Sequence, residues 1–141
     1  MTAAVGVRAF VPEDMGAVID MLQDVSAYRP AAQIVPALAD AFATQANCYA
    51  CVAVSDGRVI AFGSVFVLNR VRGGRTGIIE DVVVVSDVRG KGVGQLIVEA
   101  LVAAARARGC FKVSLEAAAS AQSFYAASGF EAGGLTMGIL L

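Results

Sequence analysis

The sequence predicts one domain over residues 1–141 with a mixed α/β (α+β) fold, in which a central sheet of roughly six to seven strands carries about four helices. Apolar residues in the first half alternate as in strands around a hairpin signal, whereas the second half places helices that end at glycine between apolar strands. A length of 141 residues, 57% of them hydrophobic, suffices for a single core. No repeat or linker divides the chain.

The first half begins with a strand and two helical stretches. Residues Val5 to Val11 alternate as a strand, and Pro12-Glu13-Asp14 begins a helix by placing proline and acids in its first turn. Apolar residues from Ile34 to Phe42 recur at helical spacing. Because proline lacks a backbone N–H, Pro36 is expected near a helix start or at a kink.

Two more strands complete the first half. They run from Cys48 to Val54 and from Val59 to Leu68, and the turn Ser55-Asp56-Gly57-Arg58 joins them as a hairpin. We expect these three strands to pair antiparallel. Residues Asn69 to Thr76, which contain two adjacent glycines, are expected to form a mobile basic loop.

The second half centres on a valine-rich strand from Gly77 to Val85. A long helix from Gly92 to Arg108 follows it and ends at Gly109, a common residue after a helix C-terminus. The remaining expected elements are a fifth strand from Phe111 to Leu115, a short helix from Ala118 to Ser128, and one or two strands in the tail to Leu141.

Composition excludes several classes of partner. Eleven basic and twelve acidic residues give a net charge of −1, which favours neither nucleic acid nor an anionic membrane surface. No stretch approaches the ~20 apolar residues of a membrane span. Because Met1 to Val5 lacks a basic segment followed by an apolar run, we expect no signal peptide and a cytoplasmic location.

The cysteines predict neither disulfides nor metal binding. Three cysteines suit a reducing compartment, and Cys48 and Cys51 lie in an apolar stretch that is typical of a buried strand. The sequence lacks histidine and a second ligand pair, so we expect no metal.

A glycine-rich turn follows the central strand and predicts a phosphate site. The turn Arg89-Gly90-Lys91-Gly92-Val93-Gly94 precedes Gln95 and Leu96. Three glycines in five positions let successive N–H groups point into one concavity at the positive end of a helix. A P-loop would need Lys followed by Ser or Thr, and the dinucleotide fingerprint would need Gly or Ala at position 95, which excludes both. The alternative is a plain strand-to-helix turn, which needs fewer glycines.

This pattern, Arg-x-x-Gly-x-Gly after a valine-rich strand that carries two acids, resembles the coenzyme A pyrophosphate loop of the GNAT acetyltransferases. The resemblance implies a GNAT fold, acetyl-CoA as cofactor, and a site at the carboxyl end of the central strand. The cofactor-binding residues are then expected to be Val82, Val83, Val84, Arg89, Gly90, Lys91, Gly92, Val93, Gly94, Gln95 and Tyr125.

Acetyl transfer needs an oxyanion donor, a base for the amine and an acid for the thiolate. The Val82 N–H is the candidate oxyanion donor, and the Tyr125 phenol is the candidate acid or, alternatively, a core tyrosine beside Phe124. Glu80 and Asp81 are expected on opposite faces of their strand. Glu116, after the fifth strand, is either the base or a surface residue.

Several segments resemble one GNAT branch, the glucosamine-6-phosphate N-acetyltransferases. They are residues 77–84, the loop from Arg89 to Gly94, the strand from Gly109 to Glu116, and Phe124-Tyr125 with Gly129-Phe130. The resemblance implies that Glu80, Asp81, Phe111 and Lys112 contact a sugar phosphate, that Glu116 is the base or amine orienter, and that Tyr125 serves the thiol. It also implies a homodimer whose C-terminal strands contribute across the interface.

Three departures from that branch are visible. Glu116 stands where the branch has aspartate, and Leu140 stands where it has a phosphate-binding arginine. The basic, histidine-containing segment before the central strand has become Asn69-Arg70-Val71-Arg72. Arg70, Arg72 or Arg75 either replaces the lost phosphate contacts or is a solvated loop charge.

The expected function is therefore acetyl-CoA-dependent N-acetylation of a small primary amine by direct transfer in a ternary complex. Amino sugar phosphates such as glucosamine 6-phosphate come first, and amino acids, polyamines, antibiotics or a protein amine follow. Cys110 is not a nucleophile candidate, since no histidine activates it. The alternatives are a non-catalytic acetyl-CoA-binding sensor or regulatory module, and a nucleotide-binding protein.

Overall fold

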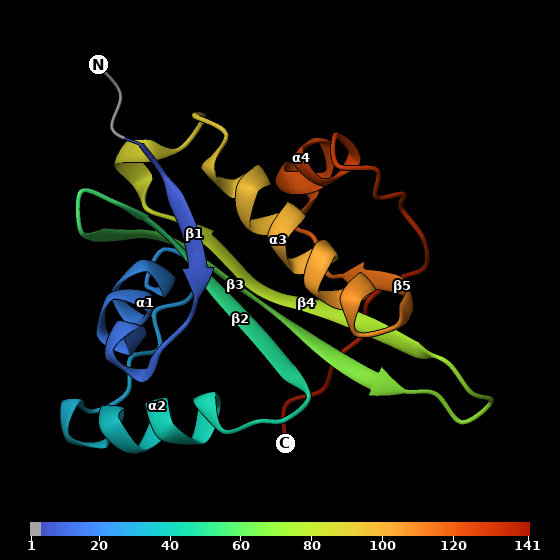
Figure 1. Cartoon of the computed structure of the whole chain (residues 1–141), viewed down its shortest axis with the longest axis horizontal. Helices are drawn as coiled ribbons and strands as arrows, with labels where there is room; N and C mark the ends of the chain where they lie inside the picture. The colour runs from blue at the N-terminus through green and yellow to red at the C-terminus, as the bar shows by residue number, and fades with distance from the viewer. Residues whose placement is uncertain (1–3) are drawn as a thin grey trace.

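The computed structural model describes residues 4–141 (Figure 1). Its strands are β1 (Gly6–Ala9), β2 (Cys48–Ser55), β3 (Arg58–Asn69), β4 (Arg75–Val84) and β5 (Cys110–Leu115), and its α-helices are α1 (Met15–Leu22), α2 (Val35–Ala43), α3 (Val93–Ala107) and α4 (Gln122–Ala126). Short 3-10 turns precede each helix. Of the segment Met1 to Val5, on which the signal-peptide expectation rested, residues 1–3 lie outside the described residues.

One five-stranded sheet in the order β1-β2-β3-β4-β5 forms the middle of the molecule. The first four strands pair antiparallel, as expected for the first three, and β5 pairs parallel to β4. The Asp56-Gly57 turn joins β2 and β3, with both residues at positive φ (50° and 73°), as a two-residue hairpin requires.

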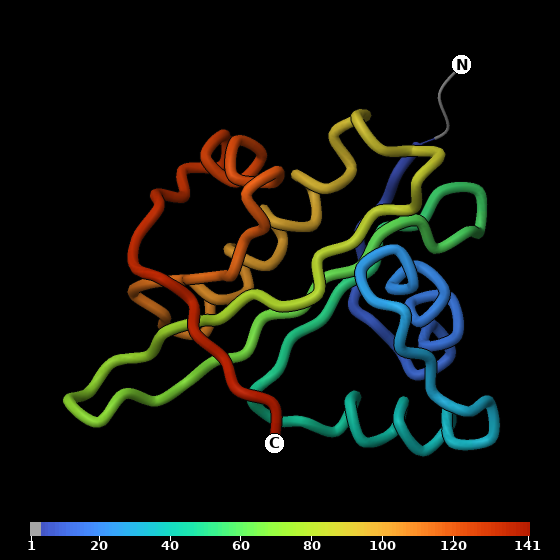
Figure 2. Tube along the Cα trace, turned by 180° about the vertical axis from the view of Figure 1, so that it is seen from behind, coloured from blue at the N-terminus to red at the C-terminus, as the bar shows by residue number. Residues whose placement is uncertain are grey.

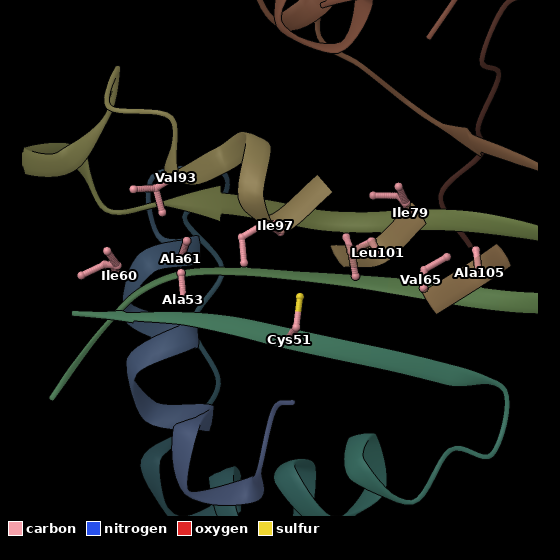
Figure 3. Packing of buried hydrophobic residues seen from close by; sticks show 10 residues of the cluster. All are labelled: Cys51, Ala53, Ile60, Ala61, Val65, Ile79, Val93, Ile97, Leu101 and Ala105. Carbon is pink, nitrogen blue, oxygen red and sulfur yellow. The ribbon is translucent and has the colours of Figure 1, made fainter. Parts of the chain in front are cut away.

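Helices cover both faces of this sheet. Helix α3 packs Ile97, Leu101 and Ala105 against one face, where they meet Cys51 and Val65 (Figure 3). The opposite face carries α1 and α2, with Val18 and Met21 against Val52 and Phe62, and the Phe10 and Phe42 rings edge-on beside them. Each fully buried valine, leucine or isoleucine side chain among these contributes about 1.5 to 3 kcal/mol, so both cores stabilise the packing of helices on the sheet.

The fold departs from the sequence expectation in the tail. Six to seven strands were expected, but residues 116–141 contain no strand, and the described sheet has five. Residues Leu135, Met137, Ile139 and Leu141 are at least 83% exposed, which explains the difference: alternation predicts a strand, but a strand forms only where a neighbouring backbone pairs with it.

The region between β3 and β4 also differs. In place of a loop from Asn69 to Thr76, the ladder continues to the pair Asn69 and Arg75, and a short turn closes it. The Arg70 N–H donates to Gly74 O and the Gly73 N–H donates to Arg70 O, both at 3.0 Å. Figure 2 shows this hairpin extending away from the body of the molecule. No helix in residues 4–141 is long and apolar enough to cross a membrane.

Candidate active site

A bulge in the central strand sets the geometry of the site. Asp81 has φ of 57°, and the register between β3 and β4 shifts opposite it, between Phe62 and Ser64. Before the bulge, Ile79 faces the α3 side, and after it Val82 faces that same side while Val83 packs on the α1 side. The expectation that Glu80 and Asp81 point to opposite faces assumed uninterrupted alternation, which the left-handed residue ends.

Strands β4 and β5 part just before this bulge. Strand β5 pairs with β4 from Arg75 to Ile79, where Ile79 lies opposite Leu115, and makes no pairing with Glu80 to Val84. The backbone of Val82 to Val84 therefore has one edge without a strand neighbour. Backbone amides at such an edge can pair with an extended, amide-bearing ligand.

The glycine-rich turn stands at the end of the parted strand. Gly90 and Gly92 adopt φ of 79° and 83°, and Gly92 precedes the first residue of α3, Val93. A side chain would strain either position, so the sequence of this turn matches its backbone. The first N–H groups of α3 and the helix dipole favour an anion in front of the turn.

Gly94 is required by close packing and not by the backbone conformation of the turn. A Cβ at Gly94 would lie 3.1 Å from Cζ of Phe124 and 3.4 Å from a methyl group of Val84. The missing side chain lets α3 approach α4 closely. Of the three glycines in the motif, two are thus required by the backbone and the third by the neighbouring helix.

Two ion pairs hold the turn to distant parts of the chain. Arg58 donates from both Nη atoms to Asp87 at 2.8 and 3.0 Å. Arg89 donates from Nε to Val84 O at 3.0 Å and from Nη2 to Asp24 Oδ2 at 2.8 Å. Sequence reasoning missed Asp24 and Asp87, because no local pattern marks a partner 65 residues away along the chain.

Three carboxylates gather where the strands part. Burial, and then the negative charges of Asp81 and Glu116, raise the pKa of Glu80 above its usual value. Glu116 directly follows the last residue of β5. Glu80 directly follows Ile79, the last residue of β4 that pairs with β5. Asp81 and Glu116, which the sequence also singled out, thus lie close enough to act on Glu80, and negative charge around Glu80 favours a cation at this point.

Tyr125 is half-buried in α4. Its ring packs edge-on against Phe124, with centroids 4.9 Å apart, and against Phe130 at 5.9 Å. Burial raises the pKa of its phenol, so the hydroxyl stays protonated over the physiological range. A neutral phenol is the form that can give up a proton.

A cleft of about 1380 Å³ runs between β5 and residues 119–136. Phe111, Lys112, Glu116 and Tyr125 all line it, so four of the expected site residues share one surface. Arg70 and Arg72 do not: they occupy the β3–β4 turn, next to the amino end of β4 and away from Glu80. Within the described residues no cluster of His, Cys, Asp or Glu could hold a metal ion.

Strands β4 and β5 part next to a glycine turn at the N-terminus of α3, and this arrangement is the one expected of an N-acetyltransferase. A model of the Acetyltransferase (GNAT) family matches residues 18–130, and the chain belongs to that family. The resemblance found in the sequence is confirmed at this level, and the fold is the GNAT fold. The family uses acetyl-CoA.

Solved structures of other acetyltransferases share this fold. An acetyltransferase from Trypanosoma brucei is 25% identical, with a TM-score of 0.88 over 98% of this chain and 100% of that chain. Glucosamine-6-phosphate N-acetyltransferase from Arabidopsis thaliana is also 25% identical, with a TM-score of 0.86 over 97% and 98%. An acetyltransferase with acetyl-CoA from Clostridium acetobutylicum shares the fold at 18% identity, with a TM-score of 0.77 over 97% and 96%. No curated protein sequence matches the chain.

Proposed function

We propose that this chain transfers an acetyl group from acetyl-CoA directly to the primary amine of a small molecule, in a ternary complex. The observation that carries the proposal is the unpaired edge of Val82 to Val84, which ends at the glycine turn before α3. The edge suits the amide-bearing arm of the cofactor, and the turn from Arg89 to Gly94, with Gln95 behind it, suits its pyrophosphate. When bound, acetyl-CoA supplies an activated acetyl thioester.

Three groups of the chain then have separate tasks. The Val82 N–H donates a hydrogen bond to the carbonyl oxygen as negative charge develops there. Glu116 accepts the proton that the amine loses, and the Tyr125 hydroxyl gives a proton to the departing sulfur. The raised pKa of Tyr125 supports its role as an acid.

Glucosamine 6-phosphate is the first acceptor to test, because the chain resembles that branch from residue 77 onward. Phe111 and Lys112 line the same cleft as Glu116, which supports a phosphate contact by Lys112. A specific observation favours a second class of acceptor: the negative charges of Asp81 and Glu116 both act on Glu80, where the amine would arrive. Such a site suits an acceptor with several amines, such as a polyamine or an aminoglycoside.

The test is release of free thiol from acetyl-CoA, with glucosamine 6-phosphate, spermidine, an aminoglycoside and an amine-free blank. We expect Tyr125→Phe and Glu116→Gln each to lower turnover by about 10²-fold to 10⁴-fold while acetyl-CoA still binds. Glu99→Gln, on the exposed face of α3, is the matched control. Binding of acetyl-CoA without turnover of any amine would instead indicate a non-catalytic sensor or regulatory module.

We also propose a homodimer. The tail presents Leu135, Met137 and Ile139 in alternation, each at least 83% exposed and without a strand partner in residues 4–141. The cleft beside β5 offers an open strand edge to such a tail from a second copy. Sedimentation of the full chain and of a chain ending at Glu131 tests this, since loss of the tail should yield monomers.

A further inference from the structure

The nine arginines divide into two groups by their partners. Four of them, Arg8, Arg29, Arg58 and Arg89, form ion pairs with Asp14, Asp20, Asp87 and Asp24. The other five, Arg70, Arg72, Arg75, Arg106 and Arg108, make no ion pair within residues 4–141. All five lie in the β3–β4 turn, at the first residue of β4, or at the C-terminal end of α3.

The sequence places no acid near them. Residues 57–79 and 100–115 contain arginines and Lys112 but no Asp or Glu, although the whole chain carries twelve acids and a net charge of −1. The molecule therefore separates its charges: carboxylates gather at the carboxyl end of β4 and uncompensated arginines at its amino end.

These arginines surround an open hollow of about 570 Å³, which we call the basic hollow. Arg70, Arg75 and Arg108 line it together with Asn69 and the glycines of the two turns, and no carboxylate does. The C-terminus of α3 contributes a negative dipole end equivalent to about half an elementary charge. Three guanidinium groups exceed this, so capping the helix does not account for the charge present.

Two of the three guanidinium groups, those of Arg75 and Arg108, are held in place by neutral partners. Arg75 donates from Nε to Asn69 Oδ1 at 3.1 Å and from Nη1 to Arg108 O at 3.0 Å. Arg108 donates from Nη1 to Ala104 O at 3.2 Å and lies over the Tyr49 ring, 4.9 Å from its centroid. These contacts fix the side chains without neutralising them, and each retains Nη2 donors that make no hydrogen bond in residues 4–141.

We propose that the basic hollow binds a phosphate group, either as inorganic phosphate or on a phosphorylated small molecule. Oriented guanidinium groups are suited to phosphate oxygens. Arg75 lies five residues before Glu80, about 16 Å along the strand at about 3.3 Å per residue. A monosaccharide whose amine lies at Glu80 cannot place its phosphate here in the same chain, so the site is separate from its own chain's acetyl-transfer site.

The test is a titration of the full chain, saturated with coenzyme A so that the glycine turn is occupied, with inorganic phosphate and separately with glucose 6-phosphate. Glucose 6-phosphate lacks an amine and cannot serve as acceptor. We expect saturable shifts of the amide NMR signals of Gly73, Gly74 and Gly109. Tighter binding of glucose 6-phosphate identifies a phosphorylated small molecule as the ligand, and equal or weaker binding identifies inorganic phosphate.

Variants complete the test. Arg75→Gln should weaken binding at least tenfold, and Arg29→Gln, which alters an exposed arginine paired with Asp20, should leave it unchanged. If Arg75→Gln fails to fold, Arg70→Gln replaces it, because the Arg70 side chain makes no hydrogen bond in residues 4–141. Shifts that do not saturate, or that persist at the same phosphate concentrations in Arg75→Gln or Arg70→Gln, overturn the proposal. The readout is specific to residues of the hollow, so failure of acetyl transfer would not affect it.

Discussion

Arg89 and Asp24 lie 2.8 Å apart, Nη2 to Oδ2, and join the turn before α3 to the segment that follows α1. Both side chains are half-exposed. The arginine that the sequence assigns to the pyrophosphate is thus already paired with a carboxylate. We expect a cofactor phosphate to compete with Asp24 for this guanidinium, so that Asp24 lowers the positive charge available to it.

We therefore expect Asp24→Asn to tighten acetyl-CoA binding by about two- to fivefold at low salt, since exposed ion pairs contribute about 0 to 1 kcal/mol. Arg89→Gln should weaken binding by a similar factor. Calorimetric titration with coenzyme A at low and high salt measures both effects, which should shrink at high salt. Asp20→Asn, which breaks the exposed pair with Arg29, is the control. Weaker binding in Asp24→Asn would show that the pair positions the turn.

The ion pair between Arg89 and Asp24 is an example of a contact that the sequence does not predict. Elements with local signals were predicted: the Asp56-Gly57 hairpin, the helix that ends at Gly109, and the glycine turn before α3. Their signals are short-range because each depends on the φ of one or two residues.

The features that were missed depend on contacts between distant segments. The left-handed Asp81 lies opposite a register shift in β3, and nothing in the sequence around Asp81 indicates that shift. Apolar residues alternate in the tail as they would in a strand, yet the tail pairs with no strand in residues 4–141. The roles of Glu116, Tyr125 and Val82 stay predictions, although two of these residues line one cleft.

The carboxylates at the parted strands predict a coupled titration. Since the charge of Asp81 contributes to the raised pKa of Glu80, Asp81→Asn should bring that pKa back toward its ordinary value. Asparagine tolerates the left-handed backbone at this position, so the bulge should persist. Carbon-detected NMR titration of the Glu80 carboxyl group measures the change, with Glu99→Gln as control.

Glu80 has a folded-state pKa above its unfolded value, so its ionisation costs stability as pH rises through that range. Asp81→Asn should therefore reduce the loss of stability on going from pH 4 to pH 7. An unchanged Glu80 pKa in Asp81→Asn would contradict the proximity of the two carboxylates.

The contribution of Asp14 to stability has the opposite dependence on pH. This residue is 5% exposed, and Arg8 donates to its two oxygens at 2.8 and 2.9 Å while the Val11 N–H donates at 3.0 Å. The hydrogen bond from Arg8 lowers the pKa of this carboxyl. Its contribution to stability is therefore present at neutral pH and lost as pH falls through the lowered folded-state value.

Arg8→Gln leaves a buried carboxylate without its charged partner and should cost about 1 to 3 kcal/mol at pH 7, and less at pH 3. Urea unfolding at the two pH values measures this. Arg29→Gln breaks an exposed pair and should cost less than about 1 kcal/mol at either pH. An equal cost of Arg8→Gln at both pH values would show that packing of the arginine, not its charge, matters.

Gly94 links the glycine-rich turn before α3 to Tyr125 through the Phe124 ring. Alanine favours a helix over glycine by about 1 kcal/mol, but its Cβ would lie 3.1 Å from Cζ of Phe124, closer than ordinary contact. Phe124 must yield by a few tenths of an ångström, and its ring packs edge-on against Tyr125. The gain in helix propensity and the cost of this contact oppose each other, so the free energy of unfolding should change by less than about 1 kcal/mol.

Turnover is more sensitive than stability to such a displacement, because a shift of about 1 Å at a reacting group can cost 10²-fold. We expect Gly94→Ala to lower kcat by about three- to tenfold with the free energy of unfolding nearly unchanged. Gly16→Ala is the matched control: it lies in α1 with no atom within 4 Å of the added Cβ, so it should stabilise the protein by up to about 1 kcal/mol and leave kcat unaltered. A normal kcat in Gly94→Ala would mean that Tyr125 keeps its place when Phe124 moves, or that its hydroxyl takes no part in the reaction; Tyr125→Phe in the same assay separates these two readings.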